Sequence, residues 1–220
     1  MNLVREIGIL LRKELVLELR NKYAISGILL YVFSTIFIIY IASVGSIQME
    51  SWNTLFWVII LFASVNAILK SFVQENSNQQ LYYYTLANPT AIILSKMLYN
   101  SVLLLLLCLL TWGCFGFIAG NPVGDTGLFV LVLFLASLGF SITFTFISAI
   151  SAKASNNATL MAILSFPLTI PILLTLIKLS ASALRMIQDT SISSDISILI
   201  AIDLILLALS FILFPFLWRD

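Results

Sequence analysis

The chain has 220 residues, of which 61% are hydrophobic and 10% are charged, and its formal net charge is +1. This composition excludes an ordinary water-soluble domain, because such domains carry about 25% charged residues. The balanced charge gives no reason to expect a nucleic-acid partner.

The N-terminal segment, residues 1–22, is charged throughout and has no uninterrupted apolar core ending in a cleavage site, so we predict no cleavable signal peptide. On a helical wheel its apolar residues share one broad side, which predicts an amphipathic helix in the membrane interface. The basic residues opposite are Arg5, Arg12, Lys13 and Arg20. Glu14 and Glu18 fall near the apolar side, where they either meet a partner or a cation from a neighbouring helix, or snorkel to water.

Six apolar stretches follow, and each is long enough to cross a bilayer, because about 20 residues of helix span the hydrocarbon layer. They cover residues 23–44, 52–70, 96–119, 126–150, 158–179 and 196–217. Since only helices satisfy their own backbone within one segment in lipid, the chain is predicted to be an all-α integral membrane protein. We expect one transmembrane domain over residues 1–220 with six membrane-spanning helices.

The connection between the second and third stretches, residues 71–95, is long and polar, and long ordered loops are often functional. We expect it to dock a soluble partner, although its tyrosines would also suit an aromatic belt at the membrane surface. The candidate docking residues are Glu75, Gln79, Tyr82, Tyr83 and Tyr84. Asn88 and Pro89 predict the N-cap and first turn of a helix that reaches residue 119.

The last two stretches contain the other candidate residues. Pro167 and Pro171 each remove a backbone hydrogen bond, so they predict a bend or interruption that is either a hinge, part of a substrate path, or only a packing feature. Lys178 and Asp203 are predicted to pair across adjacent helices. The connection at residues 180–195 has room for a short interfacial or re-entrant helix around residues 181–188.

The basic residues predict the orientation, since cytoplasmic loops retain Lys and Arg. With both termini inside, nine of the 11 basic residues are cytoplasmic, and Lys178 and Arg185 are the two exceptions. We therefore expect a multi-pass protein with a cytoplasmic N-terminus and a cytoplasmic C-terminus.

Candidates for metal or cofactor chemistry are few. The chain has no histidine, and Cys108 and Cys114 are too far apart for a CxxC motif, so we expect them to pack as small residues. We expect no metal site, no catalytic residue and no cofactor bound by this chain. No Walker A sequence is present, so we expect no ATPase site in this chain.

Three segments resemble a known family. Residues 13–20 (KELVLELR), 86–89 (LANP) and 166–174 (FPLTIPILL), together with the chain length and span count, are similar to the membrane subunits of ABC-2-type transporters. More narrowly, they resemble the CcmB family, the B component of the haem exporter of cytochrome c maturation. Residues 74–80 depart from the family, which is usually more acidic and glycine-containing there.

The resemblance implies an ABC-2-type permease in the cell inner (cytoplasmic) membrane, without its own ATPase site. Its implied partners are a CcmA-like ATP-binding subunit, CcmC-like and CcmD-like subunits that handle haem, and a second permease copy. The complex would use ATP to export haem or to release a haem-loaded chaperone. The alternatives are an ABC-2-type permease for lipid, polysaccharide or drug, and a membrane scaffold that transports nothing.

Overall fold

The computed structural model describes residues 3–20, 22–43, 46–68, 88–152, 157–187 and 191–219. Within these ranges the chain is all-helical, with seven helices and no strand. They are α1 (Leu3–Arg20), α2 (Lys22–Ala42), α3 (Met49–Ile68), α6 (Pro89–Ala119), α7 (Thr126–Ser151), α8 (Asn157–Ala183) and α9 (Ile192–Arg219).

Every apolar stretch of the sequence became a helix with ends within a few residues of the predicted ones, and α6 begins at Pro89, where the predicted N-cap places its start. Five helices, α3, α6, α7, α8 and α9, are long and apolar enough to cross a membrane. The apolar part of α2, Ser26–Ala42, is shorter than that threshold. The predicted all-α membrane class is therefore confirmed, with five spans established by length and composition.

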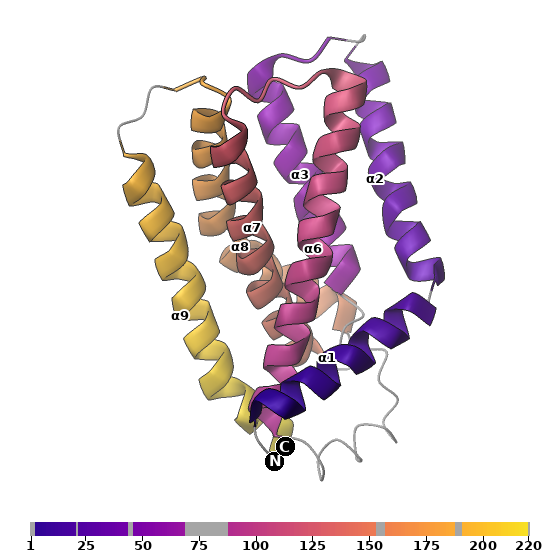
Figure 1. The fold of residues 1–220 in the computed structure, drawn as a ribbon, viewed down its shortest axis with the longest axis vertical. Helices are drawn as coiled ribbons and strands as arrows, with labels where there is room; N and C mark the ends of the chain where they lie inside the picture. Colours follow the sequence, from indigo (N-terminus) through magenta and orange to yellow (C-terminus); the bar gives the residue numbers. More distant parts are fainter. Residues whose placement is uncertain are drawn as a thin grey trace.

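The helices form an upright bundle with one helix lying across it (Figure 1). Helix α1 crosses the end of the bundle at which both termini lie, and we call this the α1 end. The connections from α6 to α7 and from α8 to α9 lie at the opposite end (Figure 1). Helix α7 is central, since it packs against α3, α6, α8 and α9, and its side chains are the most completely buried.

Aromatic rings fill the core toward the opposite end. The Trp52 ring of α3 stacks on Phe56 at 5.3 Å and on Phe115 of α6 at 5.0 Å, measured between ring centroids. Phe129, in the first turns of α7, completes the cluster at 5.6 Å from Phe56. Such ring pairs contribute roughly 0.5–1.5 kcal/mol beyond the area they bury, so this cluster fixes how three helices meet.

Helix α8 is fastened to α3 by a chain of buried polar groups. The Asn53 Nδ2 donates to the carbonyl of Ile177 at 3.0 Å, and the Ser180 hydroxyl donates to Asn53 Oδ1 at 2.7 Å. Trp57 Nε1 donates to the same hydroxyl at 2.8 Å. Hydrogen bonds of this kind tie helices together in lipid, where no water competes for them.

Helix α8 continues to Ala183 and is closed by a turn, so the separate helix predicted around residues 181–188 is not formed by the described residues up to 187. The Met186 N–H donates to the carbonyl of Ala181, and the Arg185 N–H to that of Ser182. With Arg185 at a φ of 58°, these two bonds make a Schellman motif. The prediction was wrong because the helix uses those residues as its own last turn and cap.

Candidate functional site

The junction of α1 with α6, at the α1 end, contains a hydrogen bond to a buried carboxylate and a buried ion pair. The carboxylate Oε1 of Glu6, which is buried, accepts a hydrogen bond from the backbone N–H of Asn88 at 2.9 Å. Asn88 is in turn the N-cap of α6, since its Oδ1 accepts from the Thr90 N–H at 3.2 Å. The predicted N-cap is confirmed, and the start of α6 is thereby tied to α1.

A buried ion pair joins the same two helices further along. Lys96 of α6 is only 2% exposed, and its Nζ lies 3.2 Å from Oε1 of Glu14 in α1. The Nζ of Lys13 lies 3.4 Å from the same oxygen. An ammonium taken out of water needs such a partner, because its desolvation costs several kcal/mol. The pair therefore holds α1 against α6 in one register.

The sequence left open whether Glu14 meets a partner or a cation from a neighbouring helix, or snorkels to water. The structure shows that it pairs with a cation from a neighbouring helix, Lys96. Glu18 and Arg20 belong to the backbone of α1, but their side chains lie outside the described ones. The sequence reasoning assigned no role to Lys96. Its signal was a single lysine in an otherwise apolar run, two turns into a predicted helix.

The predicted docking residues lie outside the described part of the chain. They are Glu75, Gln79, Tyr82, Tyr83 and Tyr84. The structure describes the two helices that this segment connects, α3 up to Ile68 and α6 from Pro89. The docking role therefore stays a prediction.

Pro167 and Pro171 both lie inside α8, which is a continuous helix from Asn157 to Ala183. The predicted interruption is therefore wrong, while the bend and the hinge role stay predictions. The hydroxyl of Thr169 donates to the carbonyl of Ser165 at 2.8 Å. This carbonyl is not one of those that the prolines leave without an N–H donor, which belong to Ile163 and Pro167.

Lys178 forms an ion pair, but the prediction that Asp203 is its partner is wrong. The Nζ of Lys178 lies 2.8 Å from Oδ2 of Asp195, in the first turn of α9. Because α9 begins at Ile192, Asp195 is level with the last turns of α8 at the opposite end. Asp203 follows eight residues later, which places it about 12 Å deeper along the helix at a rise of 1.5 Å per residue.

Asp203 packs instead against α7. It is 7% exposed, and a Cβ built on Gly139 would lie 2.6 Å from its Oδ1. That oxygen accepts no hydrogen bond from the described residues. The absence of a side chain at Gly139 is therefore what makes room for the carboxyl between α7 and α9.

The described helices define the class of this protein: a multi-pass, all-helical membrane protein in which a separate helix, α1, lies across one end of the bundle and is ion-paired to it. A family model described as "CcmB protein" matches residues 5–217, and the chain belongs to this family. It is thus a haem-exporter membrane component, a permease subunit of a cytochrome c maturation ABC system.

Membership of the CcmB family confirms the resemblance drawn from the sequence. Neither the curated proteins nor the solved structures contain a match to the chain. Among the described residues, no group of three or more His, Cys, Asp or Glu side chains comes together as a metal site would require.

Proposed function

We propose that the α1–α6 junction passes movement from a CcmA-like ATP-binding subunit to the membrane helices. This proposal is supported by the two contacts that join α1 to α6: the hydrogen bond between Glu6 and Asn88 and the ion pair between Glu14 and Lys96. The segment that enters α6 at Asn88 is the predicted docking segment. A displacement of that segment would therefore move α6 and α1 together, which couples ATP hydrolysis on the partner to a rearrangement of the bundle.

Disrupting the docking segment should release the ATP-binding subunit. Replacing Glu75 with Lys and Tyr82, Tyr83 and Tyr84 with Ala reverses one charge and removes three large contact surfaces. We expect co-purification of the ATP-binding subunit to fall severalfold while membrane insertion is unchanged. The matched control is Tyr40→Ala in α2, a tyrosine far from this segment in the chain. Full recovery of the ATP-binding subunit by the docking variant would refute the assignment.

The proposed orientation has both termini in the cytoplasm, α2 as a sixth span and α1 in the membrane interface. It is supported by the basic residues at the α1 end, among them Arg5, Arg12, Lys13 and Lys96. Single cysteines at Ser46 and Ser193, in a background without Cys108 and Cys114, should react with an impermeant thiol reagent from outside. A cysteine at Ser155 should not react, and the opposite labelling pattern would reverse the orientation.

The proposed hinge in α8 is supported by the contacts that hold one half of this helix in place. Beyond Pro171 the helix is tied to α3 through Ser180 and to α9 through Lys178. The half before Pro167 would then swing about the prolines. If it does, Pro167→Ala with Pro171→Ala should lower the yield of haem-attached cytochrome c at normal protein abundance, because both changes favour a straight helix. Normal yield at normal abundance would leave the prolines a packing role only.

Membership of the CcmB family supports a proposal for the wider assembly. We propose a complex in the cell inner (cytoplasmic) membrane that contains CcmC-like and CcmD-like subunits and two permease copies, with haem as its cargo. The exposed apolar faces of α2 and α9 offer surface for lipid or for a second copy. Recovery of an untagged permease with a tagged one from the same membrane would test the copy number.

A further inference from the structure

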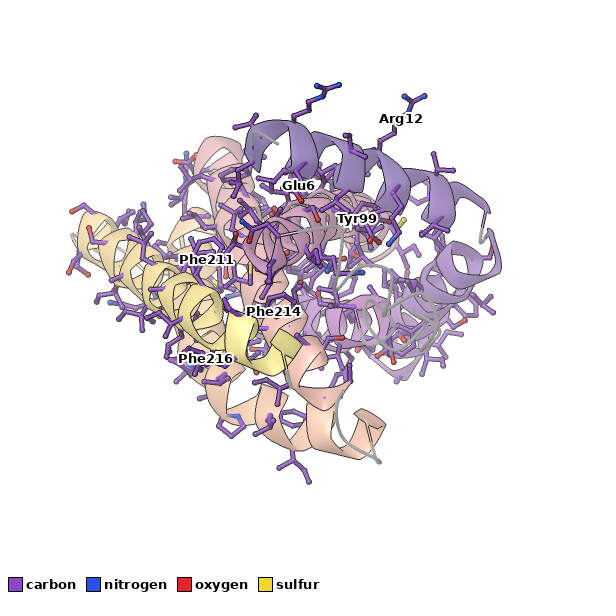
Figure 2. The ribbon with its side chains drawn as sticks, turned by 90° about the horizontal axis from the view of Figure 1, so that it is seen from below. Glu6, Arg12, Tyr99, Phe211, Phe214 and Phe216 are labelled. Carbon is purple, nitrogen blue, oxygen red and sulfur yellow. The ribbon has the colours of Figure 1, made fainter. Side chains whose placement is uncertain are left out.

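Helix α1 has two polar faces of opposite charge. The face toward the bundle carries Glu6 and Glu14, which bind the start of α6 and Lys96. The face away from the bundle carries Arg5 and Arg12, which are seven residues, or about two turns, apart and so lie on one side of the helix. Figure 2 shows Glu6 directed into the molecule and the side chain of Arg12 projecting away from it.

Neither arginine is used by the fold. Within the described part of the chain, Arg5 and Arg12 form no ion pair and no hydrogen bond. Lys13 of α1 and Lys96 of α6, in contrast, both pair with Glu14. A guanidinium is charged at every physiological pH and presents donors that match a phosphate in a bidentate manner. The outward face therefore offers two phosphate-binding groups about two turns apart, neither of which has a partner among the described residues.

Aliphatic side chains flank these arginines. Val4 is 80% exposed, and Ile9, Leu15 and Val16 are about half exposed. Apolar side chains interleaved with arginines on the open face of a helix suit the boundary between headgroups and acyl chains. Because these side chains lie on the open face of a helix at one end of a membrane bundle, they favour lipid over a soluble partner.

We propose that Arg5 and Arg12 bind the phosphate groups of anionic phospholipids in the leaflet at the α1 end. The proposal rests on the membrane orientation of α1 given under Proposed function. Each basic residue near an anionic leaflet strengthens binding to that leaflet about fivefold. Since Glu6 and Glu14 tie α1 to α6, bound lipid would also hold α1 at the membrane surface while the junction moves with the docking segment.

The test is the binding of phosphatidylglycerol to the full-length permease, measured by native mass spectrometry in a neutral detergent. Phosphatidylcholine with the same acyl chains is the lipid control. Arg5→Gln with Arg12→Gln should weaken phosphatidylglycerol binding by about 25-fold and leave phosphatidylcholine binding unchanged. The Arg5→Lys, Arg12→Lys variant keeps both charges and should retain most of the affinity.

Equal phosphatidylglycerol affinity of the wild-type and glutamine variants would overturn the proposal. If the glutamine variant bound lipid normally but no longer co-purified with the ATP-binding subunit, the arginines would contact a protein instead, and the proposal would also be overturned. Unfolding of the glutamine variant in phosphatidylcholine vesicles controls for a general loss of structure, and a variant that unfolds early is replaced by the single changes. Lipid binding is measured without the ATP-binding subunit, so failure of the docking segment leaves this result intact.

Discussion

Replacing Glu14 with Ala should destabilise the permease by about 3 kcal/mol, because the ammonium of Lys96 is left buried without its carboxylate. Removing one partner of a buried pair costs far more than the pair contributes, since the remaining charge keeps its desolvation penalty. The free energy of unfolding is measured by denaturant titration in mixed micelles. The ATP-binding subunit should also be recovered in lower yield, because α1 is released from α6.

The matched control is Glu50→Ala, an exposed acid in the first turn of α3 at the opposite end of the bundle, which should change stability by less than about 0.5 kcal/mol. Combining Glu14→Leu with Lys96→Met removes both charges and should recover most of the stability. If Glu14→Ala costs no more than Glu50→Ala, the pair does not hold the two helices together.

The second large effect is expected at Gly139. Adding the single methyl group of alanine would place a carbon 2.6 Å from Oδ1 of Asp203, closer than unbonded atoms approach. The short Asp203 side chain sits between α7 and α9, so the two helices would have to move apart. We expect Gly139→Ala to cost about 1–3 kcal/mol in the free energy of unfolding, the usual range for overpacking.

Two further variants show whether this cost comes from the contact. Gly113 lies in α6 with open space where its Cβ would be, so Gly113→Ala should stabilise the helix by up to about 1 kcal/mol. In a background with Asp203→Ala, the cost of Gly139→Ala should disappear, because the clashing carboxyl is gone. A cost that persists in that background would place the effect elsewhere.

The lengths, types and several ends of the helices were readable from the sequence. Continuous apolar runs of about 20 residues leave the backbone only the helical solution in lipid, so the runs became α2, α3, α6, α7, α8 and α9. The cap at Asn88 followed from local chemistry, since its side chain reaches a backbone N–H two residues away. Such features depend on neighbours in the chain and not on the packing of distant segments.

The partners of the polar side chains were decided only by the tertiary structure. Glu14 and Lys96 are 82 residues apart, and nothing near either one selects the other. Lys178 pairs with Asp195 rather than Asp203, because the starting point of α9 sets which acid is level with the end of α8. In lipid a buried charge takes whichever partner the helices bring within reach, and that depends on their relative heights and rotations, which the apolar pattern alone does not fix.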